Sequence, residues 1–141
     1  PHDKYDFDKC HVTPATIRKV ADKMNPIPVW GDGTELRDLL YIEDFCEALQ
    51  IVMENETENY QIYNIGCNEV YSVLDVLDKM KKIANYDAPI EFIKGKPSMI
   101  PTRKIDSNKI YDKLGWKATT SLEDGLKLAY EWYSEHKSEF K

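Results

Sequence analysis

The chain has only six glycines and three cysteines in 141 residues, and both shortages exclude familiar classes of protein. It contains no glycine-rich loop of the kind that cradles a dinucleotide or a nucleotide phosphate. Cys10, Cys46 and Cys67 are odd in number and widely spaced, with no Cys-x-x-Cys or Cys/His pattern. We therefore expect reduced thiols and no metal site, as is typical of a cytoplasmic protein.

Basic residues are also in deficit, and long apolar runs are missing. The formal net charge is -6, which disfavours nucleic acid as a partner. No stretch is long and apolar enough for a membrane span, and no signal peptide opens the chain. The polar start at Pro1, without a methionine, suggests that the sequence continues a longer protein. Hydrophobic residues make up 42% of the chain, enough for one core, so we expect a single domain over residues 1–141.

Periodicity and turn residues predict helices that alternate with a few short strands. Thr13-Pro14, Ser72 and Ser121 have the character of helix starts, and Gly115 that of a helix end. The expected helices cover residues 13–24, 43–53, 72–83, 107–114 and 121–133, and the expected strands cover 27–30, 36–42, 60–65 and 89–93. This order predicts a mixed α/β fold with a small sheet, packed against a larger partner.

Four residues draw attention before any family is considered. His11 stands just before a predicted helix, where the positive helix end favours a neutral imidazole that can move a proton. Lys19 lies on that helix, where it serves either a ligand or only a solvated face. Arg37 falls in an apolar strand and needs an anionic partner, either a phosphate or carboxylate ligand or a structural ion pair. Trp30, before a Gly-Asp-Gly turn, either stacks on a base or sugar or fills the core.

A fifth candidate is Arg103, which follows the proline-containing loop that begins at Lys96. Such a loop either closes over a ligand or remains a plain surface loop. Together the five candidates favour a phosphate-bearing ligand beside a proton donor.

The ordered motifs resemble the C-terminal half of the extended short-chain dehydrogenase/reductase family, the NAD(P)-dependent nucleotide-sugar epimerases, dehydratases and reductases. The resemblance covers nearly the whole chain and is greatest to the branch that contains the fucose synthases. Its residues are Pro1 to Tyr5, Cys10-His-Val-Thr-Pro-Ala15, Val29-Trp-Gly-Asp-Gly-Thr34, Arg37-Asp-Leu-Leu-Tyr-Ile-Glu-Asp44, Asn64-Ile-Gly66, Pro101 to Asp106 and Leu114-Gly-Trp116.

This resemblance implies a role for each candidate. His11 matches a histidine that exchanges protons with the sugar during epimerisation, and Lys19 and Arg37 match cations that hold the nucleotide diphosphate. Trp30 matches an aromatic residue of the nucleotide pocket. Arg103 matches a basic residue on a loop that closes on the phosphates. The implied fold is a small substrate-binding domain without its Rossmann half.

The family's dinucleotide loop and its Tyr-x-x-x-Lys pair are expected upstream of Pro1. NAD or NADP would then bind mainly to that upstream half, and this chain alone would lack hydride transfer. We expect a nucleotide-diphosphate sugar as the ligand and a homodimer as the assembly of the intact enzyme. The alternatives are an epimerase or 4,6-dehydratase for UDP- or dTDP-sugars, a stand-alone binding module without catalysis, and a purely structural domain.

Overall fold

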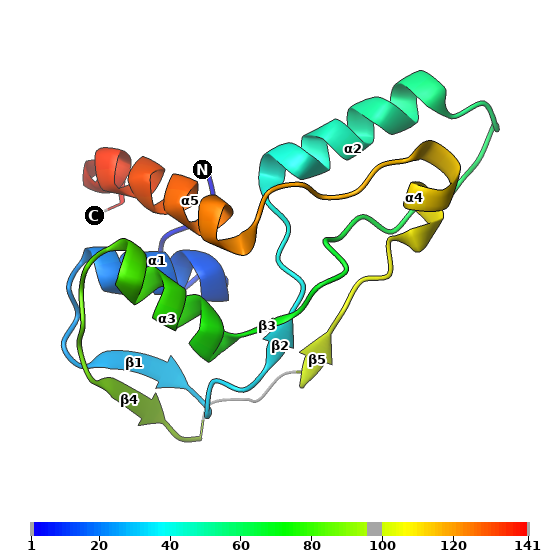
Figure 1. Cartoon of the computed structure of the whole chain (residues 1–141). Helices are drawn as coiled ribbons and strands as arrows, with labels where there is room; N and C mark the ends of the chain where they lie inside the picture. Colours follow the sequence, from blue (N-terminus) through cyan, green and yellow to red (C-terminus); the bar gives the residue numbers. More distant parts are fainter. Residues whose placement is uncertain (1, 96–99, 141) are drawn as a thin grey trace.

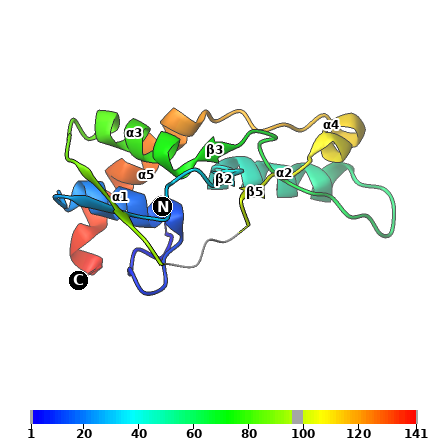
Figure 2. The same ribbon diagram turned by 90° about the horizontal axis from the view of Figure 1, so that it is seen from below.

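The computed structural model describes residues 2–95 and 100–140 and divides them between a helical body and a projecting arm (Figure 1). The body contains α1 (Val12–Ala21), α3 (Val73–Ile83), α5 (Leu122–His136), η1 (Lys137–Glu139), β1 (Ile27–Trp30) and β4 (Ile90–Ile93). The arm contains α2 (Ile42–Asn55), α4 (Asn108–Leu114) and the extended chain between them. Seen at right angles, the arm still extends away from the body (Figure 2).

Two small sheets hold these elements together. In the body, β1 and β4 are parallel, with Ile27 opposite Ile90 and Trp30 opposite Ile93. The second sheet lies between body and arm and has the order β3-β2-β5, where β2 (Leu36–Arg37) is antiparallel to β3 (Tyr71–Ser72) and parallel to β5 (Thr102–Arg103). The second sheet therefore brings residues from three distant parts of the sequence to one place.

The predicted helix boundaries are largely confirmed by their caps. Ser72 and Asp75 form a reciprocal capping box at the start of α3, which satisfies two otherwise unpaired backbone donors. Ser121 accepts a hydrogen bond from the Asp124 amide at the start of α5. Gly115 ends α4 in the left-handed conformation, with φ of 73°, that glycine adopts at little cost. Short polar residues thus fix where these helices begin and end.

The main core lies where α1, α3 and α5 pack on one another and on β1. Tyr5, from the N-terminal segment, and Tyr133, from α5, stack within it at a ring-centroid distance of 4.5 Å. The buried members of this cluster are Tyr5, Ile17, Val20, Ile27, Val29, Val76, Leu77, Met80, Ala88, Leu126 and Tyr133. Burial of these large side chains provides most of the stabilisation of the body.

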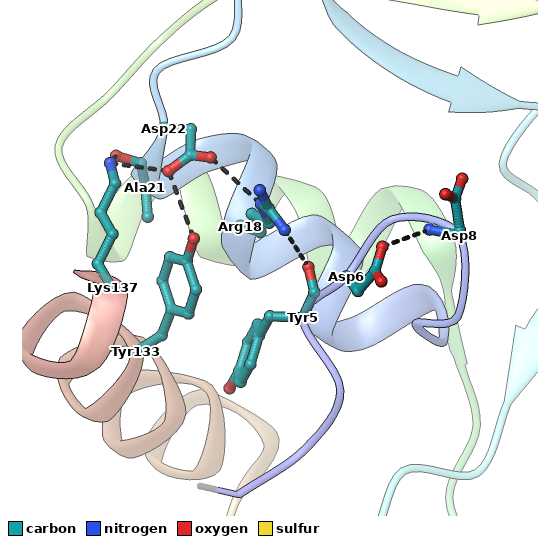
Figure 3. A network of polar contacts seen from close by, with 8 residues as sticks. All are labelled: Tyr5, Asp6, Asp8, Arg18, Ala21, Asp22, Tyr133 and Lys137. Carbon is teal, nitrogen blue, oxygen red and sulfur yellow. Dashed lines mark hydrogen bonds and ion pairs between the residues drawn. The ribbon is translucent and has the colours of Figure 1, made fainter. Parts of the chain in front are cut away.

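A polar network on α1 fastens the N-terminal segment and α5 to this core (Figure 3). The Arg18 guanidinium donates to the Tyr5 carbonyl at 2.6 Å and pairs with the Asp22 carboxylate at 3.4 Å. Asp22 also accepts from the Tyr133 hydroxyl at 3.4 Å and pairs with Lys137 at 2.7 Å. Arg18 is therefore a structural residue.

Two sequence predictions about the arm and its approach are wrong. The strand expected over 36–42 is limited to Leu36–Arg37, because Tyr41 caps α2 and Ile42 already begins it. The strand expected over 60–65 is extended chain that joins no strand in the described residues. The helix expected over 43–53 is present as α2, and much of its apolar face is exposed, with Leu49 at 43% and Met53 at 77% exposure. The helices themselves offer no membrane span, since none in the described part of the chain is long and apolar enough.

Two methionines test the division between core and open face. Met80 is fully buried in the body, so we expect Met80→Ala to lower the free energy of unfolding by about 2–5 kcal/mol through lost burial and a new cavity. Met53→Ala, at an exposed position, is the matched control and should change it by less than about 0.5 kcal/mol. Urea unfolding of the three proteins measures both values. Equal effects of the two substitutions would contradict this assignment of the core.

Candidate functional site

Four of the five candidate residues line one hollow of about 360 Å³ between α1, β1 and β2. They are His11 and Lys19 from α1 and its cap, Trp30 from the end of β1, and Arg37 from β2. The remainder of the lining is mainly apolar and includes Phe7, Ala15, Met24, Val29, Val73 and Leu77. The fold thus gathers residues 11–37 around a single concave surface.

Lys19 holds the helix side of the hollow to the strand side. Its ammonium donates a hydrogen bond to the Pro28 carbonyl at 2.8 Å, and its side chain is half-buried. Burial lowers the pKa of Lys19, because a desolvated ammonium loses hydration that a single carbonyl does not replace. The ammonium therefore retains capacity for an anion, which would stabilise its charged form.

Arg37 is held in place by carbonyl groups and not by a carboxylate. Its Nη1 donates to the Leu36 carbonyl at 2.8 Å and to the Ile100 carbonyl at 2.9 Å. Of the two partners considered from the sequence, a structural ion pair does not occur within the described ranges 2–95 and 100–140. Among the described residues no carboxylate is within ion-pair distance of Arg37, although Glu35 lines the same hollow.

Arg103 is near this charge but outside the hollow. The parallel register of β2 and β5 pairs Arg37 with Arg103, so the two residues occupy neighbouring positions on adjacent strands. Arg103 is exposed and does not line the concave surface. The preceding loop, predicted to close on a ligand, lies in part at 96–99, outside the described residues. None of the three cations Lys19, Arg37 and Arg103 has an ion-pair partner in the part of the chain that the structure describes.

Trp30 is exposed and does not fill the core. It closes β1 with 57% of its surface accessible and lines the same hollow as the two cations. This removes the core alternative that the sequence left open. An exposed indole beside positive charge is suited to stacking on a planar aromatic group.

The turn after Trp30 keeps the tryptophan and Arg37 at a fixed separation. Gly31 and Gly33 have φ of 67° and 76°, and a Cβ on Gly33 would lie 2.7 Å from the Leu74 side chain. Asp32 accepts hydrogen bonds from the amide and the hydroxyl of Thr34 at 3.0 and 2.6 Å. These bonds lower the pKa of Asp32, and they stiffen the turn. Only glycine fits at position 33.

His11 stands on the border between two hollows. It is the cap residue of α1, its side chain makes no capping hydrogen bond, and it is exposed. Besides the hollow described above, it lines a second one of about 380 Å³ with Asp3, Asp38 and Tyr41. One Asp38 carboxylate oxygen is buried there without a hydrogen-bond partner among the described residues. The imidazole is thus accessible from both sides for proton exchange.

The Tyr-x-x-x-Lys spacing does occur in this chain, contrary to expectation, at Tyr5–Lys9 and Tyr133–Lys137. Both tyrosines are core residues with 1% of their surface accessible. Burial raises the pKa of Tyr5 to about 12, and it also raises that of Tyr133. Burial therefore disfavours the ionised form of both hydroxyls, and Tyr5 is also one of the residues that line the second hollow.

Two residues of the hollow with reactive or charged side chains were not among the candidates from the sequence. Cys10 and Glu35 both line the hollow with Lys19 and Arg37. Glu35 precedes Arg37 by two positions, and the strand period of two would have placed both on one side. Cys10 precedes His11 directly and carries no comparable signal. Burial raises the pKa of the Cys10 thiol, which keeps it protonated near neutral pH.

The described residues offer neither a metal site nor a dinucleotide site. No group of three or more potential ligands among His, Cys, Asp and Glu occurs within residues 2–95 and 100–140. The N-terminus of α1 is opened by His11-Val-Thr-Pro14 and lacks the glycines that let a backbone approach a pyrophosphate. These residues do not fit NAD or NADP, so no step can be assigned to such a cofactor here.

Comparison with known proteins relates this chain to a class of enzymes. Residues 1–66 match the NAD dependent epimerase/dehydratase family. The chain has the mixed α/β fold of these enzymes over about 40% of their length, and the resemblance inferred from the sequence is confirmed.

Within this class, the curated relatives include GDP-L-fucose synthases. That of Sinorhizobium fredii is 33% identical over 135 residues, which cover 93% of this chain and 42% of the relative. That of Escherichia coli is 27% identical over 153 residues, covering 100% of this chain and 47% of the relative. The chain therefore spans less than half the length of these relatives.

Solved structures extend the comparison to other sugar nucleotides. UDP-glucose 4-epimerase of Thermotoga maritima, in complex with UDP-glucose, superposes with a TM-score of 0.87 at 25% identity, covering 97% of this chain and 43% of that one. UDP-glucuronic acid 4-epimerase of Bacillus cereus, with UDP-glucuronic acid and NAD, gives a TM-score of 0.80 at 28% identity over 90% of this chain and 40% of that one.

The three cysteines provide a chemical test of this geometry. Cys46 is exposed on α2, whereas burial raises the pKa of both Cys10 and Cys67. Because the thiolate is the reactive form, iodoacetamide at neutral pH should alkylate Cys46 well before the other two. Mass spectrometry of timed digests follows each site. Labelling of Cys10 as fast as Cys46 would contradict the described burial of the hollow.

Proposed function

We propose that this chain is the substrate-binding part of an NAD(P)-dependent nucleotide-sugar epimerase/reductase of the GDP-L-fucose synthase type. The observation that carries the proposal is a set of three cations, Lys19, Arg37 and Arg103, none of which has an ion-pair partner in the described residues. Lys19 and Arg37 line the hollow with the exposed Trp30, and Arg103 is opposite Arg37 in the strand register. A nucleoside diphosphate supplies what this arrangement lacks, because its phosphates neutralise the cations while its base stacks on Trp30.

Each cation has a distinct part in this proposal. The hydrogen bonds from Arg37 to the Leu36 and Ile100 carbonyls orient its planar guanidinium. In this orientation the guanidinium would contact two phosphate oxygens at once. Lys19 adds a point charge from the helix side, and a phosphate would stabilise the charged form that burial disfavours. Arg103 lies beside Arg37 in the register and can reach the diphosphate from the rim.

His11 is the proposed proton carrier at the sugar. It lies at the edge of the cationic hollow, where a sugar attached to the bound diphosphate would extend toward the second hollow. His11 is exposed and lines both hollows, and an imidazole is a common proton carrier in catalysis. In this role His11 takes or delivers a proton at a carbon adjacent to a sugar keto group, and inversion there requires a second proton carrier on the opposite face of the sugar.

The redox part of the reaction is proposed to lie outside this chain. NAD(P) supplies hydride transfer at the sugar when it is bound, and the residues described here have no site for it. The curated relatives are more than twice as long as the matched region, which leaves length for a dinucleotide-binding half. In the assembled enzyme, this chain would bind and orient the sugar nucleotide and move protons at its ring.

GDP is proposed as the nucleotide because GDP-L-fucose synthases recur among the relatives. The structural similarity to an epimerase in complex with UDP-glucose supports UDP as the second candidate. Both candidates place the diphosphate on the same cations, so they differ only in the base that meets Trp30.

Calorimetric titration of the chain with GDP, UDP, dTDP and CDP tests the proposal. We expect heat with one nucleotide above the others, and binding weakened about 10- to 100-fold by Arg37→Ala through the loss of charge-assisted hydrogen bonds. Lys117→Ala removes an exposed charge at a residue outside the hollow and is the matched control, with unchanged affinity. Absence of heat with all four nucleotides, or an Arg37→Ala variant that binds like the parent, would refute the diphosphate site.

A further inference from the structure

One carboxylate lies among the cations of the hollow. Glu35 lines it together with Lys19, Trp30 and Arg37, and its side chain is half-buried. Within residues 2–95 and 100–140 this carboxylate forms no ion pair and accepts no hydrogen bond. A negative charge repels a phosphate, so Glu35 does not help to hold a diphosphate. Its two oxygens are therefore available to another part of the ligand.

The Glu35 carboxylate lies toward the tryptophan end of the hollow. A Cβ built on Gly31, the residue after Trp30, would be only 3.3 Å from Glu35 Oε1. In contrast, neither Lys19 nor Arg37 is within ion-pair distance of Glu35 in the described part of the chain. The acid is thus next to the backbone that carries the indole, on which the base of the ligand is proposed to stack.

Hydrogen bonds fix the backbone on both sides of Glu35. On one side, the amide and hydroxyl of Thr34 donate to the Asp32 carboxylate at 3.0 and 2.6 Å. On the other side, the Leu36 amide donates to the Pro101 carbonyl at 2.8 Å, at the start of the pairing between β2 and β5. A carboxylate on a fixed backbone loses less conformational entropy when it binds a ligand. The position is suited to selecting one ligand over another.

The chemistry of a carboxylate determines which base it selects. An ionised carboxylate only accepts hydrogen bonds, through two oxygens side by side. Of the common bases, guanine alone presents two donors side by side, N1–H and the exocyclic N2–H. Uracil and thymine present one N–H between two carbonyl oxygens, and cytosine has an acceptor nitrogen beside its amine. Two charge-assisted hydrogen bonds therefore form with guanine, whereas a pyrimidine sets at least one acceptor against the acid.

We propose that Glu35 selects guanine, by accepting hydrogen bonds from N1–H and N2–H while the base stacks on Trp30. This proposal rests on the proposed function, because it takes the nucleoside diphosphate site as given and names the residue that chooses the base. The phosphates use Lys19 and Arg37, and the base uses Glu35. Affinity for the diphosphate and preference for the base therefore depend on different side chains and can fail separately.

Calorimetric titration with GDP, UDP and inosine diphosphate, whose base lacks the N2 amine, tests this assignment. The parent chain should bind inosine diphosphate about 10-fold more weakly than GDP. Glu35→Gln keeps the size of the side chain but replaces one acceptor by a donor. It should lower the ratio of GDP to UDP affinity about 10- to 100-fold and remove the gap between GDP and inosine diphosphate. The lost charge affects every diphosphate alike, so it cancels in these ratios.

Glu91→Gln is the matched control, because it removes an exposed carboxylate of β4 outside the hollow. Both ratios should keep their parent values in this variant, and an equal loss there would contradict the assignment to Glu35. Equal changes for all three ligands in Glu35→Gln would mean that Glu35 acts on the ribose or the diphosphate, which overturns the proposal. A parent chain that prefers UDP, or binds GDP and inosine diphosphate equally, also overturns it. All of these results leave the diphosphate site standing, whereas absence of binding to any nucleotide refutes the proposed function as well.

Discussion

The hydrogen bond from the Lys19 ammonium to the Pro28 carbonyl joins the two sides of the candidate site. α1 can supply this lysine because Ile17 and Val20 anchor the same helix in the core. β1 receives it just before Trp30, so the contact determines how the indole and the cations face one another. The bridge acts together with the main core, to which α1 contributes Ile17 and Val20 and β1 contributes Ile27 and Val29. The two effects together set the separation between α1 and β1 across the hollow. The ammonium loses hydration in this position, which is why burial lowers the pKa of Lys19.

Much of the body was predictable from local signals. Ser72 and Ser121 begin helices and Gly115 ends one because short-range hydrogen bonds and a left-handed backbone position determine those boundaries. His11, Lys19, Trp30 and Arg37 were candidates from the sequence, and the structure brings these four to one hollow. Local signals suffice here because residues 11–37 are continuous in sequence and are joined by one tight glycine turn.

The remaining features depend on contacts that no local pattern encodes. The strand expected over residues 60–65 has the composition and alternation of a strand, but pairing needs a neighbouring strand, which the described chain does not provide. The apolar face of α2, which includes Leu49 and Met53, is likewise exposed in the described chain. Periodicity reports which side of an element is apolar, and it does not report whether the partner for that side is part of the same polypeptide. The position of Arg37 opposite Arg103 could not be predicted either, because it depends on the register between β2 and β5, which are far apart in sequence.

The central claim is that a nucleoside diphosphate binds in the hollow with its base on Trp30. The indole N–H signals of the three tryptophans, followed by NMR during titration with GDP, test this most directly. The account predicts a large shift of the Trp30 signal, which comes from an exposed ring, and almost none for Trp116, which is 3% exposed in the arm. A Trp30 signal that remains unchanged at saturating GDP, or a shift confined to the other two tryptophans, would contradict it.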